Sequence, residues 1–154
     1  MITDYKSEVF IKLSNLQNLF LSNLSFTSLP HKLFQHLHKL EHLTLSKNEH
    51  LTELPSKFFA NLESLETVII KMNGIQRVPG DLFINSTEIQ TIILSENKLK
   101  EIPENIFHGQ LNLRKLDLSS NYIEAFYDET FVGLIALKNL DLSKNKIKFI
   151  NRYL

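Results

Sequence analysis

The chain of 154 residues contains no cysteine and only four glycines. Without cysteine it cannot form a disulfide framework, a thiolate metal site or a cysteine nucleophile. The few glycines form no phosphate-binding loop. Lys and Arg together number 17, as do Asp and Glu, so the neutral total gives no general attraction to nucleic acid or to an anionic membrane.

Two further absences concern location. No apolar run approaches the length of about 18 residues that a transmembrane helix requires. The start, Met-Ile-Thr-Asp-Tyr-Lys, lacks the basic and apolar regions of a signal peptide. Taken alone, these features describe a cytoplasmic protein. Hydrophobic residues make up 43% and charged residues 22%, which is typical of one folded globular domain.

The main feature of the sequence is an internal repeat. Each unit approximates LxxLxLxxNxLxxLPxxxFxxLxx, and the spacings are 24, 25, 24, 24 and 24 residues. One unit cannot bury its own apolar face, so units of this length must stack. The pattern predicts an α/β leucine-rich-repeat solenoid, with one curved parallel sheet on the concave side and largely irregular or short helical convex segments. The units begin at Leu16, Leu40, Leu65, Ile89, Leu113 and Leu137.

Particular positions of the unit have predicted structural roles. Positions 1, 4 and 6 point inward from a short strand, because side chains alternate along it. Position 9 carries an amide that can donate and accept, so a stack of them can satisfy buried backbone groups; it holds Asn48, Asn73, Asn97, Asn121 and Asn145, and Leu24 interrupts it in the first unit. Position 19 predicts an aromatic column of Phe10, Phe34, Phe59, Phe83, Phe107 and Phe131.

The repeat phase runs into both ends of the chain. Phe10 and Leu13 lie where positions 19 and 22 of a preceding unit belong, and Tyr5 lies at its position 14. The last unit stops after Ile150. We therefore expect the natural protein to continue in both directions, or a partner to cover the open coils. The predicted organisation is one uncapped domain over 1–154, with partial repeats at 1–15 and 137–154.

A unit with Asn at position 9, Leu-Pro at 14 and 15 and Phe at 19 resembles the extracellular "typical" class of leucine-rich repeat. Over residues 54–121 the sequence also resembles the ectodomains of arthropod Toll receptors, on segments such as Leu54-Pro-Ser-Lys and Pro79-Gly-Asp-Leu-Phe. This resemblance implies an extracellular segment of a membrane receptor that binds a cystine-knot cytokine of the Spätzle type. It also implies dimerisation and a role in innate immune or developmental signalling. The alternative is an adhesion or scaffold protein, extracellular or intracellular, without a signalling role.

The candidate ligand-binding residues lie between the core leucines, on the predicted concave face. Its middle column, position 5, reads Phe20, Thr44, Ile69, Ile93, Asp117 and Asp141. Outward apolar residues on adjacent strands indicate a protein-binding patch. The alternative is the ordinary preference of such residues for the middle of a strand. The predicted set is Phe20, His42, Thr44, Ile69, Met72 and Ile93.

Two sequons, Asn23-Leu-Ser and Asn85-Ser-Thr, predict N-glycosylation of Asn23 and Asn85. Asn85 is expected on an outer loop, and Asn23 near the end of a strand. Two such matches also arise by chance in a chain of this length. They agree with an extracellular location.

Other patterns suggest chemistry that the repeat geometry does not support. Asp117 and Asp141 should lie roughly 5 Å apart, as in retaining glycosidases, but an open sheet excludes no water. Lys115 and Lys138 would also neutralise them. Three histidines that could suggest zinc fall on different sides of the coil: His36, His38 and His42. We therefore predict no enzyme, no metal and no cofactor.

Nucleic acid is the least favoured partner. It is suggested only by a basic last coil, whose charges an ordinary solvated edge also explains. Binding that collapsed with salt would favour it. The basic residues are Lys138, Lys144, Lys146, Lys148 and Arg152.

Overall fold

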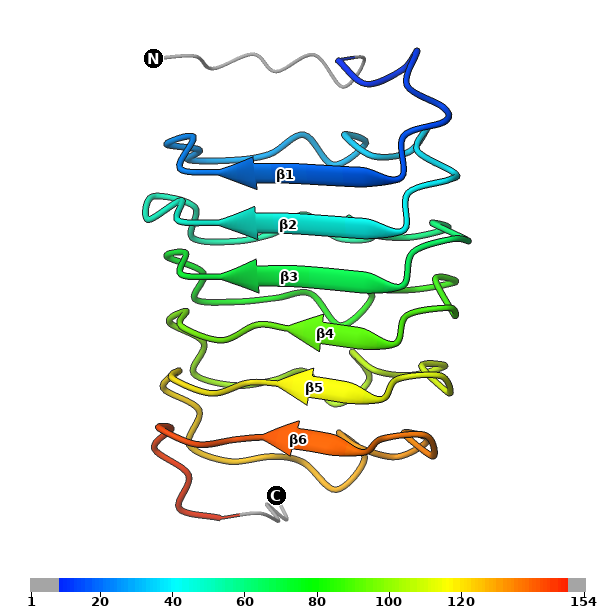
Figure 1. The fold of residues 1–154 in the computed structure, drawn as a ribbon. Helices are drawn as coiled ribbons and strands as arrows, with labels where there is room; N and C mark the ends of the chain where they lie inside the picture. Colours follow the sequence, from blue (N-terminus) through cyan, green and yellow to red (C-terminus); the bar gives the residue numbers. More distant parts are fainter. Residues whose placement is uncertain (1–8, 150–154) are drawn as a thin grey trace.

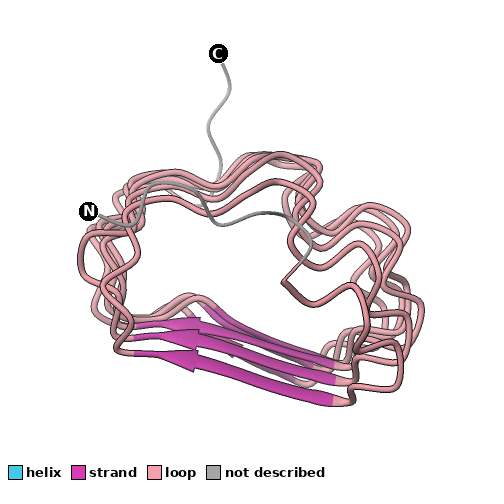
Figure 2. Cartoon of the chain, turned by 90° about the horizontal axis from the view of Figure 1, so that it is seen from above, coloured by secondary structure: helices cyan, strands magenta, loops and turns pink. Residues whose placement is uncertain are grey.

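The computed structural model describes residues 9–149 and is a solenoid of stacked coils (Figure 1). Each coil contributes one strand to a six-stranded parallel sheet whose order follows the sequence. Seen from above, the strands form one side of every coil and loops form the rest (Figure 2). This confirms the predicted leucine-rich-repeat solenoid. The strands are β1 (Asn18–Ser22), β2 (His42–Ser46), β3 (Thr67–Lys71), β4 (Thr91–Ile93), β5 (Lys115–Asp117) and β6 (Asn139–Asp141).

The core lies between the sheet and the return segments. The parallel register sets like positions of successive units side by side, so Leu43 pairs with Val68 and Ile92 with Leu116. These four side chains are fully buried. The sequence predicted irregular or short helical return segments. Within residues 9–149 they are irregular turns and contain no helix.

Phenylalanine rings fill the back of the core, as position 19 predicted. Phe107 is buried in the same column, whereas Phe131 tilts against Phe126 at 4.9 Å between ring centroids. The aromatic column is thus confirmed as a stack over its first four rings. The stacked pairs, with centroids 5.7–6.3 Å apart, are Phe10–Phe34, Phe34–Phe59 and Phe59–Phe83.

The asparagine ladder is confirmed. Asn73 Nδ2 donates to Leu45 O of the preceding coil at 3.0 Å and to Lys71 O of its own coil at 3.1 Å. Its Oδ1 accepts the Asn48 N–H at 3.0 Å. Each amide therefore links two coils. The ladder stops at the first unit. There the Leu24 N–H donates to Asn48 Oδ1, but the leucine side chain has no amide that could continue the ladder.

A left-handed backbone precedes every ladder position. The six residues at position 8 have φ between 53° and 58°, although none is a glycine. In the first five, the N–H donates to a carbonyl of the next coil; Met72 N–H, for example, donates to Ser95 O at 3.3 Å. These cross-coil bonds offset the strain of the conformation. The residues are Asn23, Lys47, Met72, Glu96, Ser120 and Lys144.

The longer second unit bulges toward the third. Its extra residue lies between Asn48 and Leu51, and a Cβ on Gly74 of the next coil would stand 2.2 Å from Glu49 O. Only glycine fits beside this bulge. The sequence showed the insertion but not the residue that accommodates it.

The first and last described coils carry exposed apolar side chains. Leu140 is 44% exposed, whereas the equivalent Leu116 is fully buried. Val9 and Ile11 are exposed at the other end. Continuation beyond these coils stays a prediction. Tyr5, Ile150 and Arg152 lie outside the described residues, and within 9–149 no helix is long and apolar enough to cross a membrane.

Candidate protein-binding surface

The outer sheet face, which is the side of β1–β6 turned away from the core, displays positions 3, 5 and 7 of each unit. The register aligns position 5 as one column from Phe20 through Thr44, Ile69 and Ile93 to Asp117 and Asp141. Neighbouring strands are about 4.8 Å apart. The column predicted from the repeat is therefore present, with one side chain per strand.

The first four members of this column form its uncharged part. Phe20 is 69% exposed, and Thr44, Ile69 and Ile93 are half-buried. Threonines at position 3, Thr67 and Thr91, flank the two isoleucines and are also half-buried. A ring this exposed leaves apolar surface in water, which a partner can cover. We call Phe20, Thr44, Ile69 and Ile93 the apolar column.

His42 and Met72 frame the apolar column on opposite sides. His42 is the first residue of β2, at position 3 of its unit; it is half-buried and precedes Leu43, which faces the core. Met72 is exposed just beyond β3 in the left-handed position, where it lines a shallow hollow with Lys47 and His50. All six predicted ligand-binding residues thus lie on the outer sheet face or at its edge.

The last two strands replace the apolar column with carboxylates. Asp117 Oδ1 accepts the Ser119 N–H at 2.9 Å and the Ser119 hydroxyl at 2.6 Å. Hydrogen bonds from the hydroxyl and then the N–H of Ser143 hold the pKa of Asp141 below its ordinary value. Each carboxylate therefore ends its own strand by binding the residue two positions later.

The arrangement of these groups does not resemble a hydrolytic site. Asp117 and Asp141 line a shallow, open hollow together with Lys115 and Lys138, and Lys115 and Lys144 lower the pKa of Asp141 further. In the part of the chain that the structure describes, no three His, Asp or Glu side chains converge to hold a metal ion. His36 instead pairs with the neighbouring Gln35 at 2.8 Å.

Both sequon asparagines are exposed, and both have a left-handed backbone. Asn23 directly follows β1, with φ 58°, and Asn85 lies on the return turn that leads to β4, with φ 61°. Asn85 Nδ2 donates to Asn61 Oδ1 of the preceding coil at 3.0 Å. Asparagine tolerates this conformation better than most residues, so the backbone alone also accounts for it. Glycosylation stays a prediction.

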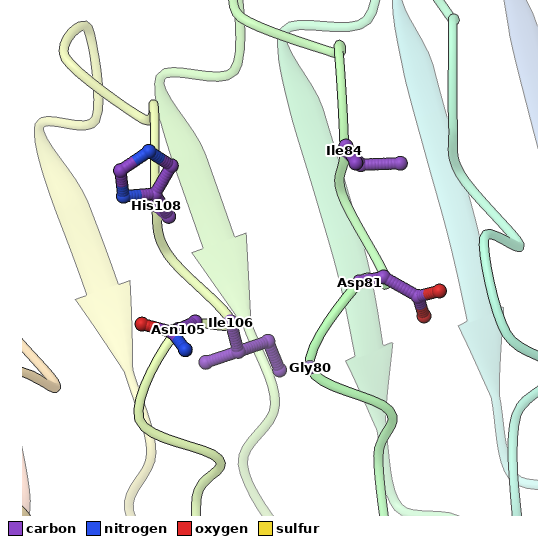
Figure 3. A pocket seen from close by; sticks show the side chains of 6 residues that line it. All are labelled: Gly80, Asp81, Ile84, Asn105, Ile106 and His108. Atoms are coloured by element: carbon purple, nitrogen blue, oxygen red, sulfur yellow. The ribbon is translucent and has the colours of Figure 1, made fainter.

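A third hollow lies on the side of the coils away from the sheet (Figure 3). Ile84 and Asp81 come from one coil, and Asn105 and His108 from the next. The Asp81 carboxylate points away from His108, because it accepts the Ser56 hydroxyl at 2.7 Å. No charged pair is therefore assembled there.

Comparison with known proteins decides the family. Residues 52–154 match the model of the BspA-type leucine-rich repeat region in six copies, and residues 14–69 match a leucine-rich repeat model. The chain belongs to the leucine-rich-repeat family. No curated protein sequence matches this leucine-rich-repeat chain.

Solved structures show which leucine-rich-repeat proteins it is similar to. In the Toll–Spätzle complex of Drosophila, described as a hub in development and innate immunity, the matching chain is 32% identical with a TM-score of 0.89. The match covers 95% of our chain and 22% of that chain. The leucine-rich-repeat domain of APL1 is 27% identical with a TM-score of 0.81, over 94% of our chain and 37% of its own. The resemblance to a segment of a Toll ectodomain is thus confirmed.

Proposed function

We propose that the chain is a protein-recognition segment of a Toll-like receptor ectodomain and that its ligand docks on the apolar column. The observation that carries this proposal is the register of β1–β4, which aligns Thr44, Ile69 and Ile93 with the exposed Phe20. Support also comes from the similar chain in the Toll–Spätzle complex, whose partner is a protein.

The energetics suit a protein ligand. Fully burying an aromatic or aliphatic side chain contributes about 1.5–3 kcal/mol, and exposed aromatic residues often supply the strongest contacts of an interface. Phe20 has most of its surface still to bury, and Ile69 and Ile93 retain part of theirs. The column can therefore supply several kcal/mol of affinity without a charged contact.

The partner proposed from this similarity is a cystine-knot cytokine of the Spätzle type, with homodimerisation of the receptor on binding. The location proposed is extracellular, in a glycoprotein that serves innate immune or developmental signalling. Our chain spans less than two fifths of the solved chains it matches. These properties therefore belong to the proposed whole receptor.

The test is a charge introduced into the apolar column of the full-length protein. Ile69→Glu together with Ile93→Glu places two carboxylates at the docking site, and Ile84→Glu is the matched control because Ile84 is exposed away from the sheet. Binding to a purified Spätzle-type cytokine dimer is measured by surface plasmon resonance. We expect at least a tenfold loss of affinity in the double variant and no loss in the control.

Unchanged affinity in a double variant that keeps its unfolding temperature would contradict docking on the apolar column. Absence of cytokine binding to the unaltered protein would contradict the proposed ligand.

A second function is favoured by the similarity to APL1, which also occurs in the solved LRIM1/APL1C complex at 27% identity. In that case the chain is an adhesion or scaffold module that assembles with another protein and does not signal. Cells that express the full-length protein separate the two functions. Output induced by ligand supports the receptor, and binding without output supports the scaffold.

A further inference from the structure

The turn that follows β1 differs from the turns that follow β2–β5. In those four coils position 9 holds a buried asparagine of the ladder, whereas here it holds Leu24, which is 46% exposed. Asn23 and Ser25, on either side of Leu24, are also exposed, and both have a left-handed backbone, with φ 58° and 53°. In Figure 1 this turn lies beyond the tip of the β1 arrow. The whole sequon Asn23-Leu24-Ser25 is therefore open to solvent.

The fold does not require an asparagine at residue 23. The other five residues at position 8 share its left-handed backbone, yet they include lysine, methionine, glutamate and serine. The Asn23 N–H donates to Ser46 O at 3.0 Å, but the Asn23 side chain makes no hydrogen bond to any described residue. The Asn23 amide is therefore available for modification.

Asn85, in the other sequon, has a structural role by comparison. Position 21 is left-handed in the second to fifth units and holds only asparagine or glycine there, which tolerate this backbone well. The Asn85 side chain is also engaged, since it donates to Asn61 Oδ1 at 3.0 Å. The fold thus accounts for the asparagine at 85 but not for the one at 23. The position 21 residues are Asn61, Asn85, Gly109 and Gly133.

Asn23 lines the shallow hollow that also contains Met72, at the edge of the outer sheet face. Both residues occupy position 8, in coils two strand spacings apart, which is roughly 10 Å. Phe20, the first member of the apolar column, precedes Asn23 within β1. A bulky group on the Asn23 amide would therefore stand beside Met72 and beside this end of the column. The lining residues are Asn23, Ser25, Lys47, Glu49, His50 and Met72.

We propose that Asn23 carries an N-linked glycan that covers this hollow and shields Met72 from protein partners. In the modification, Asn23 Nδ2 forms a bond to the first sugar carbon of an oligosaccharide carried on a lipid diphosphate. The bond from that carbon to the diphosphate breaks, and the amide gives up one proton. The glycan is bulky and sets the boundary of the docking surface, which then comprises the apolar column and His42 but not Met72. The inference rests on the extracellular location in the proposed function, because a secreted chain meets this sugar donor.

The test uses the full-length protein secreted from insect cells, with Met72→Cys as a reporter in the hollow. The 154 residues contain no cysteine of their own. Two reagents modify the new thiol, N-ethylmaleimide and a maleimide that carries a polyethylene-glycol chain, and mass spectrometry of the peptide around residue 72 gives both rates. Ser25→Ala removes the sequon and retains Asn23. We expect it to reduce the intact mass by one N-glycan and to raise the rate of the bulky reagent about fivefold.

The rate of the small reagent should stay unchanged in Ser25→Ala, which shows that the hollow keeps its structure. Thr87→Ala is the matched control, because it removes the other sequon and retains Asn85. Thr87 and Ser25 are both exposed, and Asn85 lies on a return turn at the opposite end of the strands from Met72 (Figure 1). The control should therefore leave both rates at residue 72 unchanged.

An intact mass that Ser25→Ala and Asn23→Gln both leave unchanged beyond the substitution would overturn the glycan. A glycan at Asn23 with equal rates of the bulky reagent in its presence and absence would overturn the shield. Failure of the cytokine to bind would contradict the proposed ligand without altering either measurement, so the two proposals fail separately.

Discussion

Replacing Asn97 by alanine tests whether the asparagine ladder stabilises the solenoid. Asn97 is buried, and its Nδ2 donates to Ile70 O at 2.7 Å, Leu94 O at 3.0 Å and Ser95 O at 3.1 Å. Its Oδ1 accepts the Asn73 N–H at 3.2 Å. The substitution removes all four interactions at once.

The magnitude depends on which groups keep another partner. Leu94 O also accepts Asn121 Nδ2 at 3.0 Å, and Ser95 O accepts the Met72 N–H at 3.3 Å. Ile70 O and the Asn73 N–H each lose their hydrogen bond to the Asn97 side chain. A buried polar group left without a partner costs about 1–3 kcal/mol. Two such groups predict that the free energy of unfolding falls by roughly 2–6 kcal/mol.

The matched control is the same substitution at Asn145, at the open end of the ladder. Asn145 Nδ2 makes the equivalent three bonds, to Leu118 O, Leu142 O and Ser143 O, and its Oδ1 accepts the Ile123 N–H at 3.1 Å, but Asn145 is only partly buried. Water can replace its amide, so we expect a loss of about 1 kcal/mol or less. Urea unfolding followed by circular dichroism measures both variants. Equal losses at Asn97 and Asn145 would refute the reasoning.

Three further predictions use other features of the chain. Gly74→Ala should strongly destabilise the folded chain, because the added Cβ would stand 2.2 Å from the backbone oxygen of Glu49. Gly80→Ala is the control, since its Cβ would meet only Pro103 at an ordinary contact distance of 3.5 Å. Thermal unfolding compares the two variants, and equal melting temperatures would contradict the close contact at Gly74. Ser143→Ala should raise the pKa of Asp141, since it removes the hydroxyl that lowers this pKa; NMR titration of the carboxylate checks this, and an unchanged midpoint would contradict it. Because the pKa of Asp141 is lower in the folded chain, its carboxylate stabilises the fold at pH values above its ordinary pKa. This contribution is lost as the pH falls through the folded-state pKa. Asn85→Gln should reduce the mass of protein secreted from insect cells by one N-glycan, as read by intact mass spectrometry; no mass difference beyond the substitution would contradict glycosylation at this sequon.

The sequence predicted features that depend on the repeat period. Leucines at fixed positions specify which side of each strand is buried, and a polar residue recurring at position 9 identifies the ladder before any coordinates exist. The position of Phe20 on the outer sheet face follows from the same arithmetic, because side chains alternate along a strand.

Features that depend on contacts between coils were not predictable. The left-handed residues at position 8 share no side-chain type; Lys47, Met72 and Glu96 have φ of 56–57°, and the N–H of each donates to the next coil. Nothing near Gly74 in the sequence indicates that it faces Glu49, 25 residues earlier. Both features arise from packing of one unit on another, which a single repeat does not encode.

The repeat sequence by itself determined that this protein is a stack of coils with one parallel sheet, because no unit can bury its leucines alone. The tertiary structure decided which outward residues remain exposed. Ile69 is half-buried between neighbouring strands, whereas Ile135 on a return turn is 82% exposed. Ile69 has a paired residue on each neighbouring strand, about 4.8 Å away, whereas Ile135 lies outside the sheet and has no such pairing.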